Sequence, residues 1–300
     1  MKTTKNTEEI VLTDDHSEKK IIWYPGHMIK AMNKIKEHLK AVDIVLEVRD
    51  ARSPLISGNK DLKEQIGGKN LLIVINKANL ADPEMVERWK EWFTKQEEPF
   101  VFVNCFDEDS LRQVVGKAKQ VINNRKQKEN KDYKPKTKLK MMVVGLPNTG
   151  KSTIINRLSG RNATKVADKP GQTRQQLWVK ASDDMQILDN PGVMPPVINN
   201  YEEGLWLAVI HAIPEKIVTS EETASYVINY LLQTRSEIFK EHYKMETLDT
   251  DLLGAMDQIA KSRGFLKKGN LFDYDRVYKI ILFDFRKGDL GKISFGLPPE

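Results

Sequence analysis

In this 300-residue chain the stretch that decides the fold reads Gly145-Leu146-Pro147-Asn148-Thr149-Gly150-Lys151-Ser152. It matches the pattern G-x-x-x-x-G-K-[ST] at every fixed position, and the apolar run 139–144 before it is typical of a buried strand. The glycines let backbone N–H groups surround phosphate oxygens, and the N-terminus of the helix expected from Lys151 adds positive charge. In such a loop the lysine reaches the terminal phosphates and Ser152 offers its hydroxyl to Mg²⁺. The stretch therefore predicts a strand, a phosphate-binding loop and a helix in succession.

Further apolar runs upstream have the length and composition of buried strands, and they span 43–50, 71–75 and 100–103. Helical patterns follow the last two of them. Asp82-Pro83-Glu84 supplies an N-cap acid, a proline at N1 and a first-turn acid, and 110–128 predicts another helix. Because strands that alternate with helices form parallel sheets, we predict an α/β fold with helices covering the sheet.

The last third of the chain has a helical pattern instead. Thr219-Ser220-Glu221-Glu222 is a capping box that opens a long helix through about Lys244, and Gly264 ends another. The helices expected there span 204–213, 219–244, 251–263 and 274–285. We therefore predict a disordered tail at 1–20, an α/β nucleotide domain at 21–198 and an all-helical domain at 199–300.

Composition excludes several classes of protein. A single cysteine, Cys105, rules out an internal disulfide framework and a zinc cluster of several thiolates. No uninterrupted apolar run, 71–75 among them, approaches the roughly 18 residues of a membrane span, and no apolar signal segment follows Met1. We expect a soluble cytoplasmic protein that does not enter a membrane.

Positive charge is concentrated in one segment. Residues 111–140 hold eleven Lys and Arg against two acids, whereas the whole chain has a net charge of only +6, so the remainder is net acidic. A basic strip of this kind favours a polyanion such as RNA, although a solvated helix end with a basic linker at about 125–138 explains it equally well.

Two motifs downstream of the phosphate loop complete a triphosphate site. Asp189-Asn190-Pro191-Gly192 places an acid after an apolar run and then a glycine, which suits a carboxylate beside Mg²⁺ and an N–H that senses the γ-phosphate. Between the loop and this motif, Thr173 follows a Pro-Gly turn and is expected to bind Mg²⁺ in the triphosphate state.

A base reader is expected upstream rather than downstream. Asn76-Lys77-Ala78-Asn79 follows the run 71–75, and Asn104 with Cys105 follows the next one. The base-binding elements therefore precede the phosphate-binding ones. A folded site tolerates this order when the old termini are joined and new ones open at the surface.

This order of motifs, together with Trp23-Tyr24-Pro25-Gly26-His27-Met28, resembles the circularly permuted GTPases. Within them the chain is similar to the ribosome biogenesis GTPase A (YlqF-type) family over about residues 21–300. Asp50-Ala51-Arg52 and the C-terminal Gly291-Lys292-Ile293-Ser294-Phe295 carry part of that resemblance. The fold it implies is a circularly permuted P-loop GTPase domain followed by a C-terminal all-helical domain.

The resemblance also implies a catalytic arrangement. Val193 stands where other GTPases often carry a water-positioning glutamine, and the family implicates the histidine of the P-G-H-M turn, here His27. Asn148 matches the asparagine that holds K⁺ in cation-dependent relatives, where the ion supplies positive charge near the phosphates. We expect catalytic roles for His27, Lys151 and Thr173, Mg²⁺ ligands at Ser152, Thr173 and Asp189, and K⁺ as a candidate at Asn148.

The base site departs from the family pattern. The family has aspartate where this chain has Asn79, and an amide accepts one guanine hydrogen bond while presenting an NH₂ group to the other donor. Asn190 and Cys105 replace a threonine and a serine. We therefore expect weakened guanine affinity, with GTP still the cellular ligand. The nucleotide contacts are expected at Asn76, Lys77, Asn79, Asn104, Cys105, Asn148, Thr149, Gly150, Lys151, Ser152, Thr153 and Gly192.

The function that the resemblance implies is GTP hydrolysis in late maturation of the large (50S) ribosomal subunit. The protein is expected to be a monomer that contacts the subunit and its 23S rRNA, and to turn over slowly until it binds the particle. The alternative is an RNA-binding assembly factor with relaxed guanine specificity and little hydrolysis. An adenine-nucleotide enzyme is a weaker third hypothesis.

Overall fold

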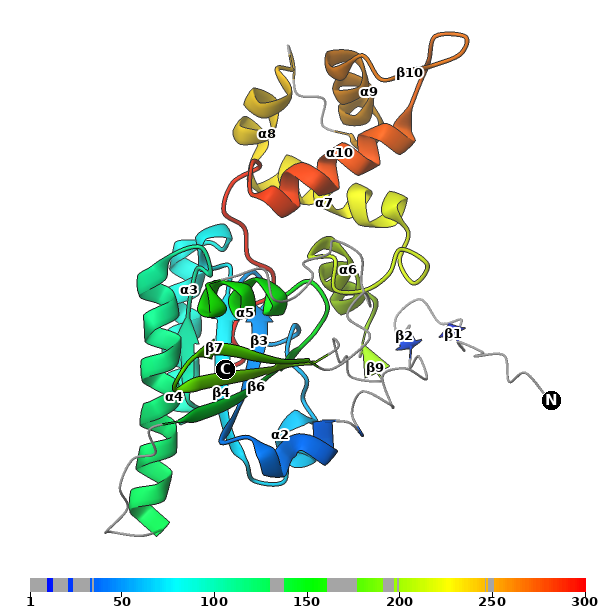
Figure 1. Cartoon of the computed structure of the whole chain (residues 1–300). Coiled ribbons are helices and arrows are strands. Elements are labelled where there is room, and N and C mark those ends of the chain that lie inside the picture. The colour runs from blue at the N-terminus through cyan, green and yellow to red at the C-terminus, as the bar shows by residue number, and fades with distance from the viewer. Residues whose placement is uncertain are drawn as a thin grey trace, which may run out of the picture.

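Figure 1 shows the computed structural model of the chain, which describes residues 10–12, 21–23, 33, 35–129, 138–160, 177–190, 197–198, 200–245, 247 and 251–300. A six-stranded sheet of order β5-β4-β3-β6-β8-β7 forms its centre. The strands are β3 (Ile44–Asp50), β4 (Asn70–Asn76), β5 (Phe100–Phe102), β6 (Leu139–Gly145), β7 (Leu177–Ser182) and β8 (Met185–Asp189). The strands predicted at 43–50, 71–75, 100–103 and 139–144 are confirmed, with small shifts at their ends.

Five of these strands run parallel, and β7 pairs antiparallel with β8 at one edge. The sequence patterns did not predict this edge hairpin. The turn between Ser182 and Met185 is short enough to join neighbouring strands directly, whereas a parallel pair needs a long crossover.

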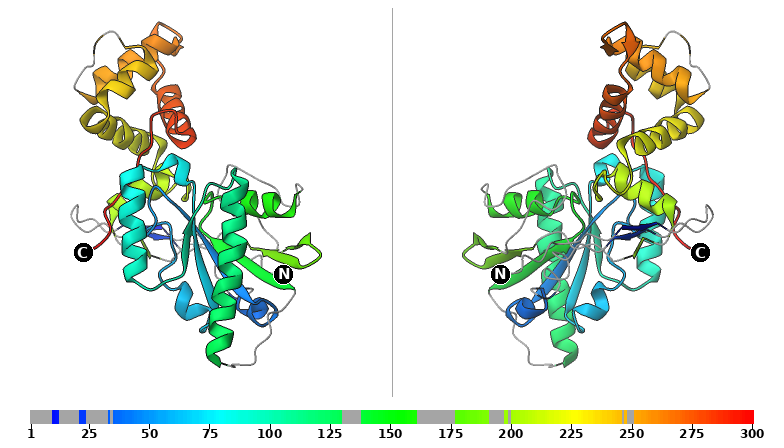
Figure 2. Two further views of the ribbon diagram at one scale, coloured as in Figure 1. Left: turned by 90° about the vertical axis from the view of Figure 1, so that its left-hand side faces the viewer. Right: turned by 90° about the vertical axis from the view of Figure 1, so that its right-hand side faces the viewer.

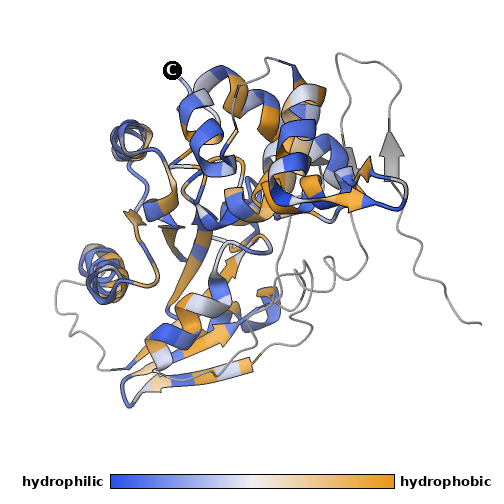
Figure 3. Ribbon diagram, turned by 90° about the horizontal axis from the view of Figure 1, so that it is seen from above, coloured by the Kyte–Doolittle hydropathy of each residue, from blue (hydrophilic) through white to orange (hydrophobic). Residues whose placement is uncertain are grey.

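Helices cover both faces of the sheet, as predicted. In β4, Leu72 and Val74 belong to the same buried cluster as Val114 of α4 (Glu108–Glu129). The intervening Ile73 and Ile75 belong to a cluster with Trp89 of α3 (Pro83–Lys95). Successive side chains of a strand point to opposite faces, so an apolar strand of this kind fits only between two helical layers. Figure 3 shows the corresponding hydrophobic colour along the strands.

The remaining elements of the α/β part are short. They comprise η1 (Leu39–Ala41), α2 (Leu62–Gln65), η2 (Ala78–Leu80) and α5 (Lys151–Ser159). Asp82 caps α3 as predicted, because its side chain accepts hydrogen bonds from the backbone N–H groups of Glu84 and Met85.

A small second sheet differs from the sequence expectation. β1 (Ile10–Leu12) pairs antiparallel with β2 (Ile21–Trp23), which also pairs with β9 (Val197–Ile198). Residues 10–12 were expected in a disordered tail. The three consecutive apolar residues there match a second apolar triplet at 21–23, and such runs favour strand pairing.

The C-terminal part is largely helical and lies beyond one end of the sheet (Figure 2). Its elements are α6 (Tyr201–Val209), α7 (Ser220–Thr234), α8 (Ser236–Tyr243), α9 (Leu252–Arg263), β10 (Leu266–Lys267), β11 (Leu271–Phe272) and α10 (Tyr274–Lys287). The capping box at Thr219 and the terminal Gly264 are confirmed. Packing of α7, α8, α9 and α10 buries one apolar cluster, which includes Val227, Phe239, Ile259 and Ile281. None of the described helices is both long and apolar enough to span a membrane.

Two details of this part correct the sequence analysis. The long helix expected through Lys244 is broken at Arg235, whose φ of −144° lies outside the helical range. The guanidinium of Arg235 forms an ion pair with Asp82 at 2.9 Å between Nη2 and Oδ2, a long-range contact that no local pattern reveals. The short β10–β11 hairpin also interrupts what was expected to be an all-helical region.

Candidate nucleotide-binding site

The carboxyl ends of four parallel strands meet at one edge of the sheet, and each ends in a residue of the site. Asp50 ends β3, Asn76 ends β4, Gly145 ends β6 and Asp189 ends β8. This edge is where ligands bind in open α/β sheets. The sheet therefore brings together segments that lie far apart in the sequence.

The phosphate-binding loop follows β6 and ends at α5, as the sequence predicted. Gly145 has φ 143°, and a Cβ there would overlap the carbonyl oxygen of Val48. Gly150 has φ 98°, and a Cβ there would overlap the side-chain amide nitrogen of Asn76. Both positions therefore require glycine, which tolerates positive φ and close approach. Ser152 and Thr153 lie in the first turn of α5.

Lys151 is buried at the start of α5, and its Nζ donates to the carbonyl oxygen of Leu146 at 2.6 Å. Burial lowers the pKa of Lys151 to about 8; the charge of Asp189 opposes that shift and the charge of Lys77 adds to it. An anion placed beside the ammonium would restore its ordinary pKa. A phosphate would therefore stabilise the charged form of Lys151, which burial disfavours.

Asp189 provides the features that a Mg²⁺ site needs. Its Oδ1 is buried and has no hydrogen-bond partner, and burial raises the pKa of the carboxyl to about 6 against the opposing charge of Lys151. A divalent cation would satisfy this oxygen, and hard oxygen ligands with a phosphate are what Mg²⁺ prefers. The described residues contain no group of three His, Cys, Asp or Glu that could hold a metal alone. Asp189 and Ser152 therefore fit Mg²⁺ only together with other oxygen ligands, such as those of a nucleotide.

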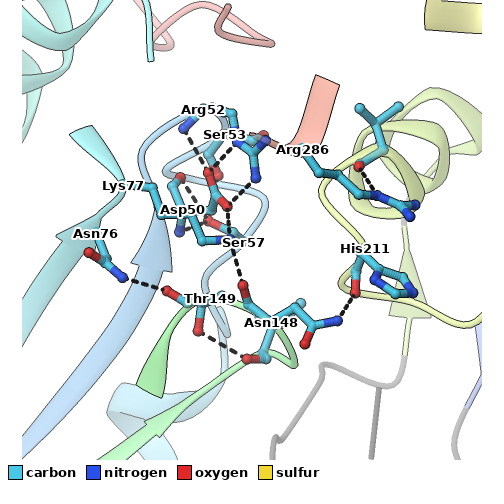
Figure 4. Close-up of polar contacts among 12 residues, drawn as sticks. Asp50, Arg52, Ser53, Ser57, Asn76, Lys77, Asn148, Thr149, His211 and Arg286 are labelled. Atoms are coloured by element: carbon cyan, nitrogen blue, oxygen red, sulfur yellow. Dashed lines mark hydrogen bonds and ion pairs between the residues drawn. The ribbon is translucent and has the colours of Figure 1, made fainter. Parts of the chain in front are cut away.

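The predicted base-reading loop, residues 76–79 and the turn to Asp82, contacts the phosphate loop directly (Figure 4). Asn76 donates from Nδ2 to the carbonyl oxygen of Thr149 at 3.0 Å and accepts at Oδ1 from the backbone N–H of Cys105 at 3.1 Å. Lys77, in the left-handed region with φ 63°, donates from Nζ to the carbonyl oxygen of Asn148 at 2.6 Å. These bonds join the predicted base and phosphate segments into one site.

The other predicted base residues lie around this junction. Asn79 lies exposed on η2, and the buried Cys105 follows Asn104, whose Oδ1 accepts from the backbone N–H of Phe106 at 3.1 Å. Burial raises the pKa of the Cys105 thiol above its ordinary value, so it is a neutral packing group. The amide Nδ2 of Asn190 donates to the carbonyl oxygens of Val143 and Leu188 at 3.2 and 3.3 Å, which gives this substitution a structural role.

A buried ion-pair network binds Lys77 of the base-reading loop. Asp50 binds Arg52 through both carboxylate oxygens, at 2.9 Å from Oδ1 to Nε and 2.8 Å from Oδ2 to Nη2. The Nζ of Lys77 lies 3.0 Å from Oδ2 of the same carboxylate. Burial alone would raise the pKa of Asp50, but the charges of Arg52 and Lys77 outweigh it and hold that pKa well below its usual range. The sequence motif at 50–52 alone does not indicate this ion-pair network.

The helical part also contacts the site. Asn148 has φ 58° and donates from Nδ2 to the carbonyl oxygen of His211 at 2.8 Å. The segment after α10 returns to the base-reading loop, where the N–H of Ile293 donates to the carbonyl oxygen of Leu80 and the N–H of Asp82 donates to Oγ of Ser294. No contiguous motif could have indicated these contacts.

Three predicted site residues, His27, Thr173 and Gly192, lie outside the described residues. The described part brings together Asn76, Lys77, Asn148, Thr149, Gly150 and Lys151 through the contacts above. The base-reading loop precedes the phosphate loop in the chain, which is the permuted order that the sequence predicted.

Comparisons with known proteins agree with this site. The family model described as "50S ribosome-binding GTPase" matches residues 140–259. "Ribosome biogenesis GTPase A" of Bacillus pumilus is 35% identical over 279 residues, covering 93% of this chain and 99% of the relative. The protein of the same name from Bacillus cereus is 34% identical, covering 93% of this chain and 95% of the relative.

A solved structure, GNP-bound YlqF from T. maritima, matches with a TM-score of 0.61 and 26% identity, covering 90% of this chain and 99% of the other. These similarities extend across both the α/β part and the helical part. The chain therefore belongs to the ribosome biogenesis GTPase A (YlqF) family, and it is a circularly permuted, GTP-binding GTP hydrolase.

Proposed function

We propose that this GTPase acts in late maturation of the large (50S) ribosomal subunit in the cytoplasm, as a monomer that contacts 23S rRNA. The observation that carries the proposal is the similarity to ribosome biogenesis GTPase A over 93% of the chain. The basic segment 111–140 and the helical part at 199–300 supply the surfaces for RNA. Salt-dependent cosedimentation of the full chain with purified subunits tests the electrostatic part of this binding.

GTP hydrolysis is slow in the free protein and is stimulated by the bound particle in this proposal. The hydrogen bond from Asn148 to the carbonyl oxygen of His211 supports it, because a particle that binds the helical part has a direct contact to the phosphate loop. A shift of a few tenths of an ångström in that loop would change how Lys151 and the backbone N–H groups meet the phosphates.

The roles of the site residues complete the proposal. Ser152, Asp189 and Thr173 hold Mg²⁺, and the carbonyl oxygen of the Asn148 side chain is the candidate ligand for K⁺. His27 positions the attacking water, which Val193 cannot do because it has no donor or acceptor. The orphaned Oδ1 of Asp189 supports the Mg²⁺ assignment.

Single-turnover hydrolysis with and without large subunits tests this function. The wild-type protein is expected to hydrolyse GTP faster when subunits are present, and His27→Ala is expected to lose that stimulation while retaining GTP binding. His16→Ala, in the predicted N-terminal tail, is the matched control. Undiminished stimulation of His27→Ala would remove His27 from the mechanism. Absence of stimulation in the wild type would favour an assembly factor that binds nucleotide without particle-stimulated hydrolysis.

A further inference from the structure

The loop that follows β4 carries Asn79 on η2. Asn76 and Lys77 anchor this loop to backbone carbonyls of the phosphate loop, and the N–H of Ala78 donates to the carbonyl oxygen of Val103 at 3.0 Å. Asn79 itself is exposed. The next backbone groups, at Leu80 and Asp82, bind the returning C-terminal segment. The loop is therefore held on both sides of Asn79, whose exposed side chain takes no part in these anchoring bonds.

The hydrogen-bonding pattern of an amide does not match the edge of guanine. Guanine presents two neighbouring donors, N1–H and the 2-amino group, whereas the Asn79 side chain offers one acceptor oxygen and one NH₂ donor. One donor of the base then faces another donor. Xanthine carries N1–H beside a carbonyl at C2, so the amide oxygen accepts from N1–H while the NH₂ group donates to the C2 oxygen. Hypoxanthine keeps N1–H and has only a hydrogen at C2.

Neighbouring carboxylates are engaged elsewhere and do not replace the missing acceptor. Asp82 accepts from the first turn of α3 at Oδ1 and pairs with Arg235 at Oδ2. Asp50 is buried and binds Arg52 and Lys77. Asp107, beyond Asn104, accepts from the backbone and hydroxyl of Ser110. Using any of them for a base would require breaking these bonds.

We propose that Asn79 relaxes the selectivity for guanine, so that this site binds xanthine nucleotides at least as tightly as guanine nucleotides. The proposal rests on the nucleotide site of the proposed function and concerns the base alone, because the phosphate contacts are the same for every base. One unmatched donor weakens binding by about 5- to 150-fold.

Calorimetric titration of the full-length protein with GDP, XDP, IDP and ADP tests the proposal without the complication of hydrolysis. The wild type is expected to bind XDP at least as tightly as GDP. IDP is expected to bind more tightly than GDP, because it lacks the 2-amino group that faces the amide. ADP has no N1–H for the amide oxygen to accept, so it is expected to bind more weakly than XDP. Wild-type binding of GDP more tightly than XDP would overturn the proposal.

The variant Asn79→Asp supplies the reciprocal measurement. It restores a second acceptor, so the affinity for GDP is expected to rise by about 5- to 150-fold while the affinity for XDP falls. The matched control is Asn124→Asp, an equivalent change at an exposed position of α4, whose second half extends toward the opposite end of the sheet (Figure 1). This control is expected to leave both affinities unchanged.

The outcomes separate this inference from the proposed function. An unchanged GDP-to-XDP ratio in Asn79→Asp overturns the inference alone. Failure of all four diphosphates to bind overturns the nucleotide site and with it both proposals. A base preference as expected, combined with no stimulation by large subunits, supports the inference and contradicts only the proposed function.

Discussion

The phosphate-binding loop and the base-reading loop lie in contact, yet they are stabilised by different means. The phosphate loop takes much of its shape from residues 145–152 themselves, through two glycines with positive φ and a buried lysine that bonds within the loop. Asn76, Lys77 and His211 add hydrogen bonds from outside it. The base-reading loop is held by contacts with other segments. Lys77 pairs with Asp50 and donates to the phosphate loop, and Leu80 accepts a hydrogen bond from the C-terminal segment.

This difference teaches where sequence variation can be tolerated. A change within the phosphate loop affects its backbone conformation directly, and the motif is intact in this chain. A change of the Asn79 side chain leaves the anchoring bonds in place, because these involve Asn76, Lys77 and backbone groups. The bonds that join the two loops therefore do not depend on Asn79, the side chain that we propose sets the base preference.

The largest effect is expected when the support of the base-reading loop is removed. Asp50→Asn leaves Arg52 buried without its carboxylate, which costs about 3–5 kcal/mol for a buried pair. Urea unfolding of the variant should show a lower midpoint. The matched control is Asp109→Asn, which breaks an exposed ion pair with Arg112 and should change stability little. Equal effects of both variants would show that the network does not support the loop.

The sign of the pH dependence follows from the same network. The folded-state pKa of Asp50 lies below its ordinary value, so the stabilisation is present above that ordinary value and is lost as the pH falls below it. The difference in stability between the wild type and Asp50→Asn should therefore shrink as unfolding is measured at progressively more acidic pH.

A smaller effect, on binding rather than stability, is expected from Lys151→Ala. The loss of a charged hydrogen bond to phosphate costs about 1.5–3 kcal/mol, or roughly 10- to 150-fold in affinity. GDP and XDP should weaken by the same factor, measured by calorimetry. Lys63→Ala, at an exposed ion pair on α2, is the control. A base-dependent effect of Lys151→Ala would contradict the separation of the two loops.

The smallest expected effect is proton uptake. Because the pKa of Lys151 is about 8 without phosphate, binding of GDP at pH 8 should take up roughly half a proton as the ammonium becomes fully protonated. Titrations in two buffers of different ionisation enthalpy measure this uptake. It should disappear in Lys151→Ala and persist in Asn79→Asp. Uptake that persists in Lys151→Ala would assign the proton to another group.

The sequence predicts those features whose cause is local. The phosphate loop, the cap of α3 at Asp82 and the capping box at Thr219 each depend on a few consecutive residues, and each is found as predicted. The alternating strand and helix patterns likewise predict the parallel sheet, because burial between two helical layers makes its strands predominantly apolar.

The remaining features depend on residues that are distant in the chain. Asn76 and Thr149 are 73 positions apart, and Arg235 meets Asp82 across 153 positions. The break between α7 and α8 lies at Arg235, which pairs with Asp82. No pattern of consecutive residues indicates such a contact. Asp50 and Arg52 could be quoted from the sequence, but only the fold reveals that they are buried together.

The returning C-terminal segment has a consequence for the order in which the protein matures during its own synthesis. Ser294 binds Asp82, a residue made 212 positions earlier, and Ile293 and Phe295 bind the backbone of Leu80 and Arg52. Because translation proceeds from the N-terminus, the strands and the phosphate loop emerge well before this segment does. The loop after β4 therefore receives these hydrogen bonds only after the helical part has been made.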